Sequence, residues 1–161
     1  LIEPNNHLYE KISGNRSCLA SNSLLWGDKS EVDYISFSQK RNTLSGIKGI
    51  KSHANHLVKN KIGDWEIIRT TPKTLQEALL ENDCPKHIDL LSLDVEGAEA
   101  HILKSFNFNL FSFEVLLVET AQLTKEHNAD LRSSLSNEGY TKIHNIAGSG
   151  DSIFHNDKSR T

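Results

Sequence analysis

Several features that mark particular protein classes are scarce in this sequence of 161 residues. Its two cysteines, Cys18 and Cys84, have neither the number nor the spacing of a disulfide framework or a zinc site, so we expect two free thiols. No apolar run approaches the roughly 18 residues that a membrane-spanning helix needs. The basic residues are scattered and the net charge is −3, which argues against a nucleic-acid partner. An apolar content of 37% is ordinary for a single globular domain.

The motifs of several enzyme classes are also missing. The sequence has no Gly-x-Ser-x-Gly elbow, no Walker-type phosphate loop and no cysteine–histidine nucleophile arrangement. It has eight histidines, but none falls in a ligand-spaced cluster. His53 and His56 are three residues apart, a spacing that occurs in metal sites but more often has no such meaning.

Strand and helix patterns alternate along the chain, which predicts an α/β layered sheet. Strands are expected at residues 1–3, 17–20, 31–38, 65–70, 88–93, 115–118, 140–144 and 151–155, and helices after Asn5 or Asn6, after the capping box that starts at Thr74, after Gly97 and at 125–138. The strand at 88–93 is almost continuously apolar, as is typical of a central parallel strand covered on both faces. The last two strands are expected to form an antiparallel pair around the turn Gly148-Ser149-Gly150. Residues 39–63 show no sustained period and are predicted to form a long loop or lid insertion, with a helical turn near 53–58.

Three of the predicted strands end in an acidic residue, namely Glu3, Asp94 and Glu119. Ligands of α/β sheets lie at the carboxyl ends of the strands, so these side chains are expected to share a cleft. Glu3 either accepts hydrogen bonds from both hydroxyls of a nucleoside ribose or only stabilises the N-terminus of the helix that follows. Glu119 either faces Asp94 across the cleft or is an ordinary strand-end acid.

The turn after the buried strand is crowded with carboxylates, in the run Asp94-Val95-Glu96-Gly97-Ala98-Glu99. Their mutual repulsion has to be offset by a helix N-terminus, a divalent cation or a cationic ligand. Plain helix capping accounts for one or two of these acids, with Asp94 as the cap and Glu99 in the first turn, but not for the set. We therefore expect a functional site here, with Asp94 at the reacting centre.

Several segments resemble the FkbM-type methyltransferases, in matching order along essentially the whole chain. The residues that carry the resemblance are Ile2-Glu3-Pro4-Asn5, Asn22-Ser23-Leu24-Leu25-Trp26-Gly27-Asp28-Lys29 leading into Glu31-Val32, Thr74-Leu75, Ile88-Asp89-Leu90-Leu91-Ser92-Leu93-Asp94-Val95-Glu96-Gly97-Ala98-Glu99, Leu116 with Val118-Glu119, Gly139-Tyr140, and Asp151 with Ile153-Phe154. The run at 88–99 is the most specific mark of the family. The resemblance implies a Rossmann-like class I methyltransferase sheet, mostly parallel with an antiparallel C-terminal edge pair.

The resemblance further implies transfer of a methyl group from S-adenosyl-L-methionine to an oxygen, often the hydroxyl of a sugar or another small polar acceptor. Carried over by position, Glu3 holds the cofactor ribose, and Asn22 and Ser23 lie near the adenine. Asp94 then sits beside the sulfonium methyl group, where the acceptor oxygen arrives. The acceptor, a small molecule or a glycan, is expected to contact residues 39–63.

Two ways of activating the acceptor hydroxyl remain open. Asp94 acts as a general base, or a cation held by Asp94 with Glu96, Glu99 or Glu119 lowers the hydroxyl pKa. Because all these ligands are oxygens, the metal hypothesis favours Mg²⁺ or Mn²⁺ over zinc.

The first strand and the glycine-rich loop of the family, which cradles the methionine part of the cofactor, are expected ahead of Leu1. Residues 1–161 are therefore expected to form a single, partial methyltransferase domain, truncated at the N-terminus. The alternative function is a degenerate, non-catalytic binding module that keeps the sheet. A metal-dependent hydrolase is less favoured, because no metal-ligating histidine or nucleophile accompanies the acids.

Overall fold

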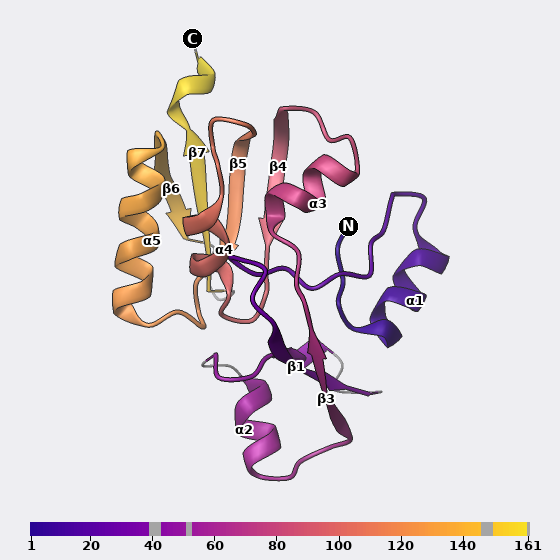
Figure 1. The fold of residues 1–161 in the computed structure, drawn as a ribbon. Helices are drawn as coiled ribbons and strands as arrows, with labels where there is room; N and C mark the ends of the chain where they lie inside the picture. Colours follow the sequence, from indigo (N-terminus) through magenta and orange to yellow (C-terminus); the bar gives the residue numbers. More distant parts are fainter. Residues whose placement is uncertain (39–42, 51–52, 146–149, 161) are drawn as a thin grey trace.

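The computed structural model describes residues 1–38, 43–50, 53–145 and 150–160, which form a mixed α/β fold (Figure 1). Its elements in chain order are α1 (Asn6–Asn15), β1 (Val32–Phe37), β2 (Gly46–Ile47), α2 (His53–Lys59), β3 (Trp65–Thr70), α3 (Leu75–Glu81), β4 (His87–Leu93), α4 (Glu99–Ser105), β5 (Ser112–Glu119), α5 (Lys125–Asn137), β6 (Tyr140–Asn145), β7 (Asp151–Asn156) and a final 3₁₀ turn (Asp157–Arg160).

The larger sheet has the strand order β4-β5-β7-β6 and is mixed. β4 and β5 are parallel and joined by α4, whereas β7 is antiparallel to both β5 and β6. The C-terminal antiparallel pair is confirmed, with β6 at the edge. The prediction of a mostly parallel sheet is wrong for the described strands, because β4-α4-β5 is the one crossover unit among them and β7 runs back from β6 alongside β5.

The smaller sheet has the order β2-β1-β3 and is antiparallel throughout. Its strands at 32–37 and 65–70 were both predicted, but they pair with each other, from Val32↔Thr70 to Phe37↔Trp65, and not with the larger sheet. Together with α2 they form a lobe at the lower end of the molecule (Figure 1). A small core of Ile35, Phe37 and Leu57 lies between β1 and α2.

The segment predicted as a long loop contains regular structure where it is described. The expected helical turn is confirmed as α2, and β2 is an additional short strand that pairs with β1. Residues 39–42 and 51–52 of this segment lie outside the described residues, as do residues 146–149, which include part of the predicted turn Gly148-Ser149-Gly150.

The predicted environment of β4 is also wrong. This strand pairs with β5 alone among the described strands and therefore lies at the edge of the sheet. Leu93 is buried in the main core, whereas Leu90 is 55% exposed. Continuous apolar sequence predicts cover on both faces, but the described elements cover only part of this strand.

Local hydrogen bonds fix the N-terminal segment and the starts of helices α1 and α3. The strand predicted at residues 1–3 is reduced to an isolated parallel bridge, Ile2↔Ser21. The strand predicted at 17–20 is wrong, because the bridge falls at Ser21 and residues 17–20 are not in strand conformation. Asn5 caps α1 by accepting hydrogen bonds from the backbone N–H groups of its first turn. The capping box of α3 is confirmed: Glu77 N donates to Thr74 Oγ1, and Thr74 N donates to the Glu77 carboxylate.

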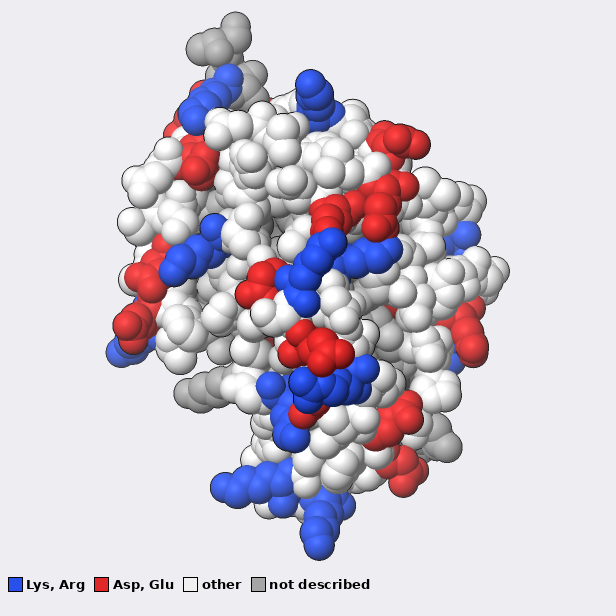
Figure 2. All heavy atoms as spheres, viewed as in Figure 1, with Lys and Arg blue, Asp and Glu red and all other residues white. Residues whose placement is uncertain are grey.

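The surface agrees with the composition. On the face drawn in Figure 2, basic and acidic side chains are interspersed, so no surface of a single sign forms there. No helix in the described part of the chain is long and apolar enough to cross a membrane. Cys18 and Cys84 are free thiols, as predicted.

Candidate functional site

A cavity of about 250 Å³ lies where the two sheets meet. Its walls come from the N-terminal segment, the stretch after the Ile2↔Ser21 bridge, β1, the region of β2 and the turn after β4. The lining residues are Ile2, Glu3, Pro4, Leu8, Ser23, Leu24, Leu25, Tyr34, Thr43, Ser45, Gly46, Ile47, Asp94, Val95 and Glu96. A second cavity of about 270 Å³ shares Pro4, Ser23, Leu24 and Tyr34 with the first. Each lies near the lower end of the roughly 300–1,000 Å³ that small-molecule sites occupy.

Glu3 contributes a half-buried carboxylate to this cavity. Its Oε1 accepts a hydrogen bond from Asn5 N at 2.8 Å, which fixes the orientation of the side chain. Burial raises the pKa of Glu3, and the N–H of Asn5 partly opposes this shift. Glu3 thus presents an oriented acceptor group to the cavity, as the ribose-binding hypothesis requires.

Asn5 connects this carboxylate to the smaller sheet. The Asn5 side chain is fully buried, and its Nδ2 donates to Phe37 O and to Ser45 Oγ, both at 2.9 Å. Ser45 Oγ also accepts from Phe37 N at 3.0 Å. Tyr34 belongs to the same cavity wall, where burial raises its pKa and a hydrogen bond with Ser45 opposes the shift. The position of Glu3 therefore depends on contacts with β1 and with the residue just before β2.

The turn between β4 and α4 is built around Glu99. Glu96 and Gly97 both adopt positive φ angles, 57° and 102°, which is uncommon for a glutamate and ordinary for glycine. This backbone directs the N–H groups of Val95 and Gly97 to Glu99 Oε1, at 2.9 and 3.3 Å. Glu99 is fully buried, and burial raises its pKa while these N–H donors oppose the shift. Glu99, which was predicted to be a first-turn acid or a metal ligand, thus stabilises this turn by accepting hydrogen bonds from its backbone.

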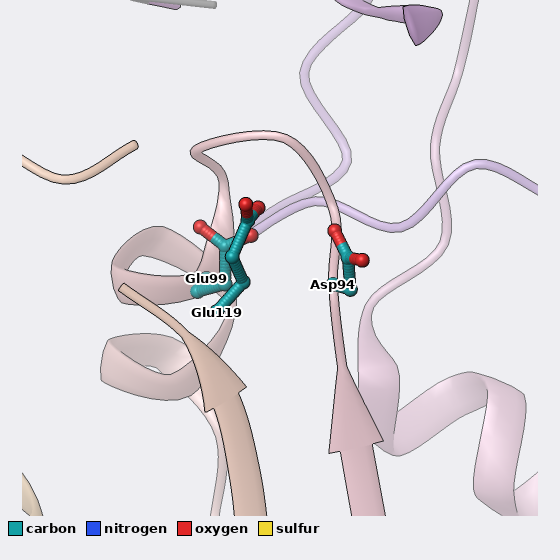
Figure 3. Close-up of side chains that lie close together, drawn as sticks. All are labelled: Asp94, Glu99 and Glu119. Carbon is teal, nitrogen blue, oxygen red and sulfur yellow. The ribbon is translucent and has the colours of Figure 1, made fainter. Parts of the chain in front are cut away.

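Asp94 and Glu119 complete a group of three carboxyls with Glu99. One oxygen from each lies within 4.8 Å of the others. Figure 3 shows Glu119 at the end of β5 against Glu99 at the start of α4, with Asp94 at the end of β4 beside them. Burial, the charge of Asp94 and a hydrogen bond with Asp94 raise the pKa of Glu119 to about 8. Glu119 thus lies close to Asp94, as expected, but it does not line the cavity to which Glu3 and Asp94 contribute, so the expectation that all three strand-end acids share one cleft is wrong for this cavity.

The other predicted residues are only partly brought to this place. Glu96 lines the first cavity but is not a member of the three-carboxyl group. Ser23 lines both cavities, and Asn22 lines the second. Asn22 Nδ2 donates to the carbonyl oxygens of Glu3 and Pro4, at 3.0 and 3.3 Å, so its amide also holds the N-terminal segment in place.

Sequence reasoning did not identify the wall formed by Tyr34, Thr43 and Ser45 as part of the site. Tyr34 lies in the strand predicted at 31–38, and the other two fall in the segment predicted as a loop. They reach the cavity because β1 pairs with β2, through Tyr34↔Ile47 and Ile35↔Gly46. No local sequence pattern encodes that pairing.

Comparison with known protein families decides the general class. The model of the methyltransferase FkbM domain matches residues 1–142, which include Glu3, the whole turn at 94–99 and Glu119. The chain belongs to the FkbM methyltransferase family. No curated protein and no solved structure matches it. The resemblance noted from the sequence is thereby confirmed, and β7, which borders β5, lies beyond the matched residues.

Proposed function

We propose that this FkbM-family chain is an S-adenosyl-L-methionine-dependent O-methyltransferase with a Rossmann-like arrangement, acting on a hydroxyl of a sugar or another small polar acceptor. The observation that carries the proposal is the cavity that Glu3 and Asp94 share. An oriented carboxylate suits a ribose, and a second carboxylate at the end of β4 suits the reacting centre.

The residues present fit the nucleoside part of this cofactor. Glu3 would accept hydrogen bonds from the ribose hydroxyls, since Asn5 N already holds one of its oxygens in place. Asn22 and Ser23 line the adjoining cavity, where the adenine would lie. When bound, the cofactor supplies an electrophilic methyl group carried on a sulfonium sulfur.

The part of Asp94 in the transfer is to receive the acceptor hydroxyl. With the cofactor bound, its methyl group would pass to the acceptor oxygen and leave a neutral thioether behind, and the Asp94 carboxylate would take the proton of the hydroxyl. Positioning in a cleft from which water is excluded provides most of the rate acceleration in such an in-line displacement. Leu24, Leu25 and Ile47 supply apolar surface to that cleft.

The proposed role of Glu3 is tested by removing either its charge or a ribose hydroxyl and comparing the losses in affinity. Affinities of adenosine, 2′-deoxyadenosine and S-adenosyl-L-methionine are measured by calorimetry for the wild-type chain, for Glu3→Gln and for Glu10→Gln. Glu10 is an exposed acid of α1 and serves as the matched control. In the wild type, loss of the 2′-hydroxyl should weaken binding about tenfold or more, as expected for a hydrogen bond to a charged group.

If Glu3 binds the ribose, the preference for adenosine over 2′-deoxyadenosine should depend on its charge. Glu3→Gln should bind adenosine less tightly than the wild type and discriminate little between the two nucleosides, whereas Glu10→Gln should behave as the wild type. Equal affinity of the wild type for both nucleosides would remove Glu3 from the ribose site.

Methyl transfer is tested separately, with a panel of monosaccharides and mass spectrometry of the products. Replacing the exposed Asp94 by Ala should abolish transfer while the far-ultraviolet circular dichroism spectrum is retained. Cofactor binding without transfer to any acceptor would instead support the non-catalytic binding module.

A further inference from the structure

The three-carboxyl group of Asp94, Glu99 and Glu119 has the composition of a cation site. One oxygen from each residue lies within 4.8 Å of the other two. These residues come from the end of β4, the start of α4 and the end of β5, so the fold itself, and not one flexible loop, brings them together (Figure 3). Three carboxylates at such distances repel one another strongly unless a cation lies among them or one of them is protonated.

The buried oxygens of this group are a second, independent observation. Glu99 is fully buried, and its Oε1 is occupied by the N–H groups of Val95 and Gly97. Its Oε2 is also buried and has no hydrogen-bond partner among the described residues. Glu119 Oε2 likewise has no donor there, because a hydrogen bond between Glu119 and Asp94 needs a proton on one of the two acids. Buried polar atoms in folded proteins almost always have a partner, and an unpaired one is energetically costly.

The described residues do not supply the missing charge. Among the described residues, the ion pairs that Lys and Arg form involve acids outside this group, such as Lys29 with Glu77 and Arg69 with Glu31. No histidine or cysteine belongs to the group. A set of oxygen ligands without nitrogen or sulfur selects a hard cation, and the charge of three carboxylates favours a divalent one.

We propose that Asp94, Glu99 and Glu119 bind one divalent cation of the Mg²⁺ or Mn²⁺ type. Glu99 and Glu119 bind the cation on the side of the protein interior. Asp94, which also lines the cavity, places the cation next to the proposed acceptor position. Glu96, which the sequence also suggested as a ligand, is not one of the three. Cation binding stands on the geometry alone, whereas its closeness to the acceptor rests on the proposed function.

The test is a Mn²⁺ titration of the chelator-treated chain at pH 7.5, without nucleoside, following the electron paramagnetic resonance signal of free Mn²⁺. We expect one Mn²⁺ bound per chain and displacement by Mg²⁺. Glu119→Gln and Glu99→Gln should each weaken binding about tenfold or more, a loss that changes around metal ligands already produce. Gln at position 99 keeps a carbonyl acceptor for Val95 N and Gly97 N, so the turn is preserved.

Glu96→Gln is the matched control, because it removes the same charge from the same turn without removing a member of the group. Its Mn²⁺ affinity should change by about threefold or less, because Glu96 would act on the ion only through its charge and not as a ligand. Equal losses in Glu96→Gln and Glu119→Gln overturn the proposal, because the three-carboxyl group is then not the ligand set. No Mn²⁺ bound by the wild type also overturns it and indicates that protons alone offset the repulsion. Since the titration contains no nucleoside, either result leaves the ribose test of Glu3 unaffected.

Discussion

Replacing Glu119 by Gln should make the metal-free chain more stable at alkaline pH. The pKa of Glu119 is raised from 4.5 to about 8 in the folded state. A raised carboxyl pKa favours the folded state only while the group is protonated, so its contribution is complete below about pH 4.5 and is lost as the pH rises towards 8. The full pKa shift would correspond to a change of roughly 5 kcal/mol in the free energy of unfolding. Solvent screening of this partly exposed residue reduces that change to about 2 kcal/mol.

Gln cannot ionise, and its amide N–H can donate to Asp94 as the protonated acid does. In EDTA, urea denaturation should therefore give similar free energies of unfolding for wild type and Glu119→Gln at pH 5. At pH 8.5 the variant should be about 2 kcal/mol more stable, or roughly 4–8 °C higher in Tm for a chain of this size. Parallel pH dependences in the two proteins would refute the raised pKa and the carboxyl pair behind it.

Three further substitutions test other contacts in the structure by denaturant unfolding. Glu99→Ala, which leaves two turn N–H groups without their acceptor, should lower the free energy of unfolding by about 3 kcal/mol, whereas Glu99→Gln should lose less than half of that. Asn5→Asp should cost about 2–3 kcal/mol, because a carboxylate then faces a carbonyl of β1; a purely capping role predicts almost no loss. Gly150 has φ +82° and an added Cβ would lie 2.5 Å from the Cβ of Ala121, so Gly150→Ala should cost about 2–4 kcal/mol, while Gly14→Ala, where no atom lies within 4 Å, should not destabilise.

Elements defined by neighbouring residues could be predicted from the sequence. The capping box at Thr74 and Glu77 is confirmed, and the strand predicted at 65–70 coincides with β3. Such patterns depend on side-chain hydrogen bonds over three residues or on alternation within one strand, and both are visible in a short window. The meeting of Asp94 and Glu119 was also predictable, because both residues end adjacent parallel strands.

The partners of the strands could not be predicted in the same way. Alternating apolar residues identify 32–37 as a strand but do not say whether it joins the larger sheet or pairs with β3 in a sheet of its own. The role of Glu99 was equally hidden. Its burial depends on a turn in which Glu96 has a positive φ, and the residue type at that position gives no sign of it.

Asn5 shows why the site as a whole exceeds what local patterns contain. As a helix cap it was predictable, since the chain enters α1 at this point. Its side chain also donates hydrogen bonds to Phe37 O and Ser45 Oγ. These partners follow Asn5 by 32 and 40 positions in the sequence. Because the N–H of the same residue orients the Glu3 carboxylate, the group proposed to hold the ribose is fixed by the smaller sheet as well as by its own segment. A change in the smaller sheet, which forms the Tyr34 and Ser45 wall of the cavity, is thus expected to reach Glu3 through Asn5. The side chain of Asn5 is bonded to that sheet and its backbone N–H to the carboxylate.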